Sequence, residues 1–562
     1  MTSSLRPILL LFLIGFSGLS IQGQNEKYWV RFTDKLNTPY SIQNPEAFLS
    51  KAAIERRKKH GIEINRKDLP VDPLYKDSIL AHPAVDLLHD SKWFNAISVQ
   101  CSDSLHMDTL DALSFVAGTR KVRALTIPRP FQPKMATSPF SGNRGQEKGS
   151  WHPHKLSPGK ARRQLSMMGL DHLLELGHRG KGIRIAVLDA GFPNVDKMDA
   201  FEHLFREARY VGGYDLVEGD AYPFRGNTHG RSVLSILAAK KKGHILGAAP
   251  EASYILCRTE NGAYEYRIEE HNWVAAAEFA DSAGADILSS SLAYTTFDQS
   301  SQDHSPSDLD GATTMITRGA DLAASRGILV INSAGNYAQT SWGTLGPPAD
   351  GDSVIAVGSV DSSRNWSSFS SQGPAADGRI KPDLAAMGEG TAFLGGDAKV
   401  YRGNGTSFSA PLISGAAACL WSAHPHLKPM ELAELLQANA HQHDTPNNRV
   451  GHGIPNVYKA YLEEKGIRMA QKGDSRILQV APNPFKDRLE LHLFANGSKK
   501  LHLTWYDALG RKLSSTSHPI DPDHHHEIGI SPPSERTGLF FIRVRLKNGP
   551  VRTFRVLHQK AP

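Results

Sequence analysis

The middle of the chain alternates short apolar runs with longer segments of helical periodicity. The apolar runs occupy residues 183–189, 254–257, 285–289, 327–332 and 354–357. Helical patterns lie between them, for example at 273–280 and 316–324. Because apolar and polar residues do not alternate within these runs, they are typical of strands buried on both faces of a parallel sheet. The sequence therefore predicts an α/β domain over residues 163–463, with a mostly parallel sheet flanked by helices.

The N-terminal 23 residues have the layout of a secretory signal peptide. Arg6 precedes an apolar run at 7–16, and small or polar residues follow through Gly23. This run is too short to span a membrane, and the alternative is a buried N-terminal helix. We expect a protein that is secreted or displayed at the cell surface.

Residues 24–130 are predicted to form a small α/β domain. Residues 28–32 alternate as a strand does, and a helical pattern begins after Asn44, which is placed as a cap before Pro45. The next stretch, 131–162, is rich in Pro, Ser, Gly, Lys and Arg and has no periodicity. We expect an exposed, protease-accessible linker there.

Residues 478–562 are predicted to form a small antiparallel β-sandwich, after a second linker at 464–477. The segments alternate over short lengths, and Asn-Gly pairs at 496 and 548 are typical hairpin turns. His524, His525 and His526 lie in a polar stretch, where we expect an exposed loop and not a metal site.

The charge of the chain is divided among these modules. The chain has 562 residues and a net charge of +7, but residues 1–163 carry +10, residues 164–478 carry −9 and residues 479–562 carry +6. This division argues against a nucleic-acid-binding surface along the whole chain. Apolar residues make up 40% of the sequence, which excludes a wholly disordered chain.

The three cysteines do not indicate thiol chemistry. Cys101, Cys257 and Cys419 lie in apolar surroundings, and none belongs to a CxxC pair. We expect small core residues and neither a disulfide framework nor a cysteine-zinc site.

Three polar residues stand where an α/β domain binds its ligands. Asp189 ends the first apolar run, His229 begins a helical stretch, and Ser407 precedes an apolar helix at 412–421. A serine hydroxyl needs a base to become a nucleophile, and histidine has a suitable pKa. A carboxylate then fixes the imidazole tautomer and stabilises its positive form. Pro411 is expected near the first helical turn, where its missing N–H costs little.

Asn336 completes the chemistry. It follows another apolar strand, and its side-chain amide can donate to the oxyanion of a tetrahedral intermediate. Each residue alone also fits a structural role, such as a strand-end acceptor, a helix start, a cap or a turn. Together, and in this order, they predict nucleophilic catalysis by serine.

These residues resemble the motifs of the subtilisin-like serine proteases, the subtilases. The matching stretches are 185–191, 228–230, 333–336 and 405–411. The resemblance implies a triad of Asp189, His229 and Ser407, with Asn336 as the oxyanion donor. It also implies that two segments bind substrate as an extended peptide, namely Ser291, Leu292 and Ala293 on one side and Ser333, Ala334 and Gly335 on the other. The chemistry requires no cofactor.

The sequence departs from the subtilase pattern near the substrate subsites. Arg231 and Ser232 follow the His-Gly pair where the family has Thr-His, and Phe408 replaces a methionine. Residues 294–318 form an acidic, Ser-rich insertion. Structural calcium is compatible with the family, but Asp298, Asp303, Asp308 and Asp310 lack the spacing of a calcium loop, so no metal ligand is assigned.

The terminal modules have resemblances of their own. Residues 24–130 resemble a subtilase propeptide in position and size, with an unrelated accessory domain as the alternative. Residues 482–485, 506–511 and 538–544 resemble the C-terminal sorting domains of the type IX secretion system of Bacteroidetes. That resemblance implies export by the outer-membrane secretion machinery, with a carbohydrate- or protein-binding module as the alternative.

The predicted function is a secreted serine endopeptidase that works through an acyl-enzyme intermediate. Its expected partners are protein or peptide substrates, its own propeptide and the secretion machinery, with no nucleic acid. The main alternative is a catalytically inactive, subtilase-like binding or adhesion protein. An α/β-hydrolase esterase fits less well, because Ser407 does not lie in a GxSxG motif.

Overall fold

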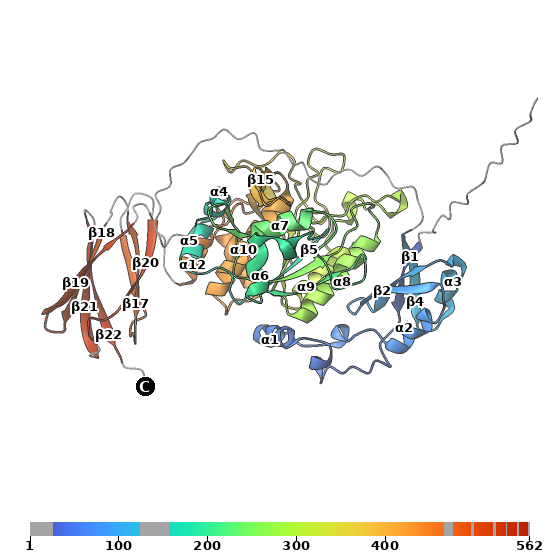
Figure 1. Cartoon of the computed structure of the whole chain (residues 1–562), viewed down its shortest axis with the longest axis horizontal. Coiled ribbons are helices and arrows are strands. Elements are labelled where there is room, and N and C mark those ends of the chain that lie inside the picture. The colour runs from blue at the N-terminus through green and yellow to red at the C-terminus, as the bar shows by residue number, and fades with distance from the viewer. Residues whose placement is uncertain are drawn as a thin grey trace, which may run out of the picture.

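The computed structural model describes residues 26–123, 157–465, 476–495, 500–520, 524–534, 537–547 and 550–559. These residues fold into an N-terminal sheet domain, a large central domain and a C-terminal pair of sheets (Figure 1). The predicted signal peptide, most of the linker at 131–162, most of the second linker at 464–477 and the two Asn-Gly turns lie outside the described residues.

The central domain is built on a seven-stranded parallel sheet, which confirms the predicted fold class. The order is β13-β12-β11-β10-β5-β9-β6. The strands are β5 (Arg184–Asp189), β6 (Tyr210–Asp215), β9 (Ser253–Arg258), β10 (Ile287–Ser290), β11 (Leu329–Ser333), β12 (Val354–Val360) and β13 (Leu384–Met387). Five of them coincide with the apolar runs. The edge strands β6 and β13 lack that signal, because β6 is half exposed and β13 has only four residues.

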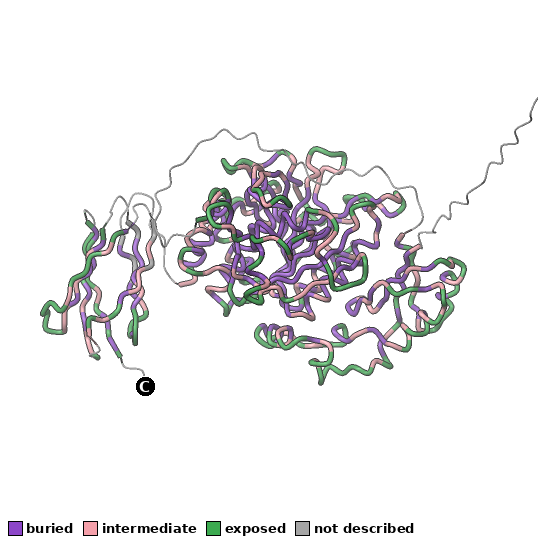
Figure 2. The backbone as a smooth tube through the Cα atoms, in the orientation of Figure 1, coloured by how far each residue is buried: buried purple, intermediate pink, exposed green. Residues whose placement is uncertain are grey.

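Helices cover both faces of this sheet, which explains the apolar runs. Along β5, Ile185 and Val187 belong to one hydrophobic cluster, whereas Ala186 and Leu188 belong to another. The helices that cover the two faces are α7 (His229–Ala238) and α10 (Thr406–Ala423) on the first, and α8 (Ile268–Ala283) and α9 (Met315–Ala324) on the second. Figure 2 shows the buried strands at the centre of the domain.

Shorter elements complete the central domain. They are α4 (Arg162–Ser166), α5 (Leu170–Glu175), α6 (Glu202–Arg206), α11 (Pro429–Ala438), α12 (Val457–Glu464) and the strand pairs β7 (Lys240–Lys241) with β8 (Ile245–Leu246) and β14 (Thr391–Leu394) with β15 (Val400–Gly403). The last residues of the predicted linker already pack here, because the backbone N–H of Lys160 donates to His244 O at 2.9 Å. In the described ranges, every helix is too short or too polar to form a membrane span.

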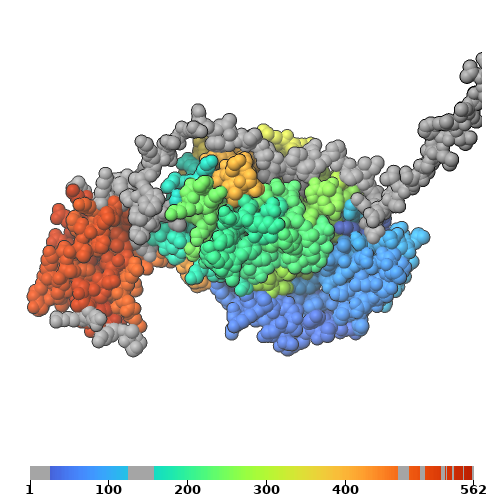
Figure 3. Space-filling model, in the orientation of Figure 1, coloured from blue at the N-terminus to red at the C-terminus, as the bar shows by residue number. Residues whose placement is uncertain are grey.

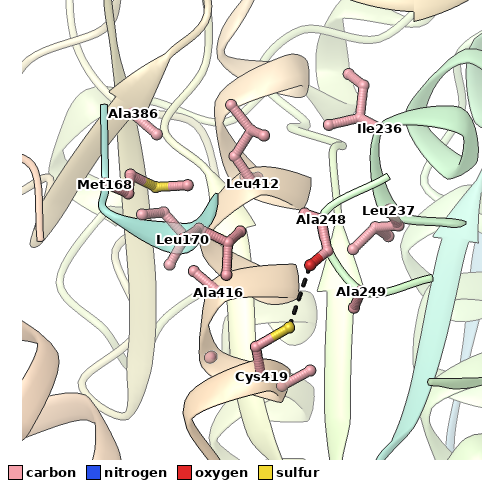
Figure 4. Packing of buried hydrophobic residues seen from close by; sticks show 14 of the residues in the cluster. Met168, Leu170, Ile236, Leu237, Ala248, Ala249, Ala386, Leu412, Ala416 and Cys419 are labelled. Atoms are coloured by element: carbon pink, nitrogen blue, oxygen red, sulfur yellow. Dashed lines mark hydrogen bonds between the residues drawn. The ribbon is translucent and has the colours of Figure 1, made fainter. Parts of the chain in front are cut away.

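The cysteines are buried and unpaired, as the sequence predicts. Cys419 lies on α10, where its Sγ contacts Ala248 O at 3.2 Å among close-packed apolar side chains (Figure 4). Burial raises the pKa of the Cys257 thiol to about 12, so this thiol stays protonated.

The N-terminal domain is an antiparallel sheet with helices. The strand order is β2-β3-β1-β4. Its elements are β1 (Glu26–Phe32), α1 (Lys51–His60), α2 (Pro73–Leu80), β2 (Val85–Ser91), β3 (Ala96–Cys101), α3 (Ser104–Thr109) and β4 (Val116–Arg123). Asn44 does precede a helical turn that begins at Pro45, but this turn is a single 3₁₀ turn, Pro45–Ala47, and the Asn44 side chain makes no capping hydrogen bond. Ser50 caps α1 instead, and its Oγ accepts from the backbone N–H of Ala53 at 3.2 Å.

The C-terminal part consists of two antiparallel sheets around one hydrophobic cluster, as predicted. Their strands are β16 (Arg476–Ala481), β17 (Leu489–Ala495), β18 (Lys500–Asp507), β19 (Lys512–Pro519), β20 (His524–Ile530), β21 (Gly538–Leu546) and β22 (Val551–His558). The loop predicted for His524 to His526 is wrong. These residues begin β20 and pair with β17, so cross-strand pairing overrides the polar composition of the segment.

Candidate active site

Asp189 and His229 form a buried, hydrogen-bonded pair at the carboxyl edge of the sheet. Asp189 is the last residue of β5 and is fully buried. Its Oδ1 accepts from His229 Nδ1–H at 2.6 Å and from the backbone N–H of Ala190 at 2.7 Å. Since one carboxylate oxygen holds both donors, the imidazole is fixed relative to the end of β5. This bond leaves Nε2 as the imidazole nitrogen that can accept a proton.

Gly230 allows this close approach of α7 to β5. A Cβ at Gly230 would lie 2.5 Å from Gly191 O and 2.8 Å from Asp189 Cβ, so any other residue would push the helix away. The backbone N–H of His229 donates to Asn227 Oδ1 at 3.0 Å, which caps the first turn of α7. The glycine after the histidine is therefore a packing requirement of the site.

Ser407 is the second residue of α10 and lies beside the segment that follows β10. Its Oγ–H donates to Ser291 O at 3.4 Å, and Ser291 Oγ–H donates to Ser407 O at 3.0 Å. In a regular helix, Ser407 O would accept from the N–H of residue 411, but that residue is proline. Pro411 thus lies inside α10 and not in its first turn, and it leaves Ser407 O available to Ser291.

Asn336 is oriented by the residue that precedes Ser407. Its Oδ1 accepts from the backbone N–H of Thr406 at 2.9 Å and from Thr406 Oγ1–H at 3.0 Å. Because the amide oxygen already accepts both bonds from Thr406, Nδ2 is the atom of this side chain that can donate to a bound group. The N-terminal end of α10 adds backbone N–H groups that favour negative charge at the same place.

The two predicted substrate segments flank Ser407. Leu292 O accepts from Asn332 Nδ2 at 3.0 Å, and Ala293 O accepts from Tyr337 Oη at 3.3 Å, so the first segment is held rigidly. On the other side, the backbone N–H of Gly335 donates to Thr406 Oγ1 at 3.3 Å. The structure thus brings Ser291, Leu292, Ala293, Ser333, Ala334 and Gly335 together around the start of α10.

The departures from the family pattern have local explanations. The Arg231 guanidinium is buried and donates to Pro193 O at 3.2 Å, and burial lowers its pKa. Phe408 is buried and stacks on Phe393 of β14, with ring centroids 5.1 Å apart. Phe408 therefore fills the core beside the site, and Arg231 lies against the turn between β14 and β15, since a Cβ at Gly396 would lie 2.9 Å from its Nη1.

The carboxylates of the insertion at 294–318 accept hydrogen bonds from backbone N–H groups. Asp303 accepts from the backbone N–H of Phe297, and Asp310 accepts from those of Ala312 and Thr313. A different group could hold a cation, because carboxylate oxygens of Glu260, Glu265 and Glu269 lie within 4.8 Å of one another. The sequence analysis missed this group, because its members are separated along the chain and match no metal-binding motif.

Comparisons with known proteins identify two family matches in the chain. A model of the subtilase family matches residues 180–453, and a model of the peptidase S8 propeptide domain of Bacteroidota matches residues 27–137. Subtilisin DY of Bacillus licheniformis is 30% identical over 282 residues, which are 49% of this chain and 90% of that protein. Subtilisin E of Bacillus subtilis is 31% identical over 271 residues, which are 47% of this chain and 62% of that protein.

Among solved structures, MycP1 from Mycobacterium smegmatis superposes with a TM-score of 0.44 at 20% identity, over 60% of this chain and 89% of that chain. The relationship rests on the sequence matches, since subtilisin DY is matched over nine-tenths of its length. With its propeptide domain and its subtilase domain, the chain belongs to the subtilase family of serine-type peptidases.

Proposed function

We propose that the chain is the precursor of a secreted endopeptidase, in which Asp189, His229 and Ser407 act as the catalytic triad. The observation that carries this proposal is the buried 2.6 Å hydrogen bond between Asp189 and His229 at the sheet edge where Ser407 begins α10. This hydrogen bond fixes the tautomer of the base that would take the proton of Ser407. No cofactor is needed for this chemistry.

The reaction proceeds by acyl transfer. His229 Nε2 takes the proton of Ser407 Oγ, and Oγ attacks the carbon of the scissile peptide bond. Asn336 Nδ2 and the backbone N–H of Ser407 stabilise the oxyanion. His229 then protonates the leaving amine, and the acyl-enzyme forms. A water that His229 activates hydrolyses the ester and frees the serine.

The hydroxyl of Ser407 gives up its hydrogen bond to Ser291 O when His229 takes its proton. Its bond to Ser291 O is long, at 3.4 Å, and is therefore weak. The substrate would enter as an extended strand between the segments at 291–293 and 333–335, which makes proteins or peptides the substrate class.

The direct test is a cleavage profile of the purified chain. We expect peptides from a proteome-derived library to be cut at internal bonds, with the sites read by mass spectrometry. A fluorophosphonate should label Ser407 and abolish the cleavage, and the labelled protein is the matched control. If the chain neither cleaves nor takes up the label, it is instead an inactive binding or adhesion protein.

Replacing Asn336 by leucine is expected to lower kcat by about 10²–10³-fold, with little change in KM. The oxyanion loses one donor, which corresponds to about 2.7–4 kcal/mol, a size found for a subtilisin. Steady-state kinetics on a chromogenic peptide measure this effect. Thr406→Val is the graded comparison: it keeps the Nδ2 donor but removes the hydroxyl that donates to the Asn336 amide oxygen and accepts from Gly335 N–H, so kcat should fall less than in Asn336→Leu. An unchanged kcat in Asn336→Leu would exclude Asn336 as an oxyanion donor.

Export and maturation form the second part of the proposal. A signal peptide at 1–23 would direct the chain into the periplasm, and the C-terminal β-module at 478–562 would engage an outer-membrane secretion machinery of type IX. The sorting motifs of that module and its separate antiparallel core support this role.

The mature form is expected to focus well below pH 7, whereas the precursor focuses near pH 9.0. Residues 164–478 carry 27 Lys and Arg against 36 Asp and Glu, so removal of both basic ends leaves an anionic enzyme. Isoelectric focusing of the secreted protein measures this change, with intact-mass analysis of the same band as the control. A mature species that still focuses at basic pH would show that one of the ends is retained.

A further inference from the structure

Part of the propeptide domain leaves its own sheet and lies against the central domain. We call residues 33–72, between β1 and α2, the arm; it contains α1. In Figures 1 and 3 the arm extends beneath the central domain, away from the rest of the propeptide. It contacts residues 281–285, in the last turn of α8 and just beyond it, and residues 326–327, just beyond α9; these two segments precede β10 and β11. This is the amino edge of the parallel sheet, opposite the edge that carries Asp189 and Ser407.

The contact is centred on a buried carboxylate. Asp281, near the end of α8, is fully buried. Its oxygens accept from Arg56 Nη2 at 2.5 Å, from Arg57 Nη2 at 3.0 Å and from Lys92 Nζ at 2.9 Å. Burial alone would favour the neutral carboxyl, but the three cations hold its pKa below the usual range. All three cations come from the propeptide.

The arm also covers the ends of two helices. Arg56 donates to Ala285 O, just beyond α8, and its Nε–H donates to Arg326 O at 3.1 Å, just beyond α9. A cation at the carboxyl end of a helix is favoured by the helix dipole. Gly327 lies at the same contact, where a Cβ would be 2.9 Å from Ile62 Cδ1, and its φ of +83° favours glycine.

Further contacts extend this surface on both sides. On α8, Glu278 accepts from Ser91 Oγ–H and from the backbone N–H of Lys92, both at 2.6 Å. At the other end, Lys59 Nζ lies 5.6 Å from the ring of Trp421, at the end of α10. The surface thus runs from α8 to the end of α10.

We propose that this surface is a second docking site for the propeptide, separate from the cleft, and that it sets how long the cleaved propeptide stays bound. The proposal rests on the assignment of residues 27–137 as a propeptide. Loss of Arg56 and Arg57 would leave Asp281 buried with Lys92 alone. Removal of partners from a desolvated charge cluster acts mainly on the dissociation rate. A cleaved precursor is therefore a non-covalent complex held at the amino edge of the sheet.

The test uses the full chain with Ser407→Ala and a site for a specific protease placed within residues 131–156. The cut complex is diluted, and release of the propeptide is followed by size exclusion at successive times. We expect Arg56→Gln with Arg57→Gln to release the propeptide at least about 100-fold faster. Lys51→Gln with Glu55→Gln is the matched control on α1, because these side chains are 91% and 64% exposed. That control should change the rate less than about twofold.

Equal release rates in the two double variants would overturn the proposal. If the arginine variant does not fold, the release rate of Lys59→Ala provides a second test. Lys59 is exposed, so its replacement removes no buried charge. It should release the propeptide about 3–10-fold faster, and an unchanged rate would again overturn the proposal. Since an added protease makes the cut, the outcome does not depend on the proposed activity. An inactive protein could still show a long-lived complex.

Discussion

A chain carrying Ser407→Ala is expected to lose at least about 10⁴-fold of its rate of peptide hydrolysis and to retain its propeptide. The substitution removes the only atom that can form the ester, while Asp189 and His229 keep their hydrogen bond. Activity on a peptide substrate and the mass of the purified chain measure the two effects. The residual rate, compared with uncatalysed hydrolysis, measures the acceleration that the oxyanion donors and substrate binding provide without a nucleophile.

Ser409→Ala is the matched control for this experiment. Ser409 lies two residues further along α10, is fully buried, and its Oγ–H donates to Ala386 O at 3.1 Å. Its loss should cost about 1 kcal/mol of stability and leave kcat almost unchanged. Equal activity of Ser407→Ala and the native chain would exclude Ser407 as the nucleophile. Equal losses in both variants would instead point to general damage at the start of α10.

The sequence suffices to predict five of the seven strands of the parallel sheet and to propose a catalytic set, because both signals are local. Buried parallel strands appear as apolar runs, and the topology of such a sheet places residues beyond their carboxyl ends on one edge. Asp189 could therefore be associated with His229 before their distance was known. The glycine after His229 and the proline after Ser407 belonged to the same motifs, but their roles in packing and in freeing Ser407 O appear only in the structure.

The arm of the propeptide could not be predicted in this way. Arg56 and Asp281 are separated by 225 residues, and no local pattern links them. From the sequence alone, α1 is predicted to be a solvent-exposed charged helix, because two adjacent arginines usually face solvent. Their burial follows from a contact between domains, which local periodicity does not encode. The same limit explains the error at His524, whose strand is set by pairing with β17.

Replacing Asp189 by alanine is expected to lower kcat by about 10⁴-fold, the size found for the equivalent carboxylate of a subtilisin. One oxygen of Asp189 holds both Ala190 N–H and His229 Nδ1–H, so its loss frees the imidazole to rotate and to change tautomer. It also removes the negative charge that stabilises the imidazolium formed during attack. Both effects act in the transition state, so we expect kcat to fall much more than KM rises. Steady-state kinetics on one peptide substrate separate the two constants.

Asp189→Asn tests whether orientation of the ring is sufficient, because the amide can hold the imidazole in place while the charge is lost and its NH2 group can donate to Nδ1, which favours the wrong tautomer. If orientation alone mattered, this variant would retain most of the native rate; we expect it to lose most of it. Asp350→Asn is the control, since Asp350 is a buried carboxylate that accepts from Thr317 Oγ1–H at 2.7 Å and from Gly311 N–H at 3.0 Å, apart from the triad. It should keep kcat within about threefold of the native value. Full activity in Asp189→Ala would mean that His229 is oriented by another group, and the proposed triad would then be wrong.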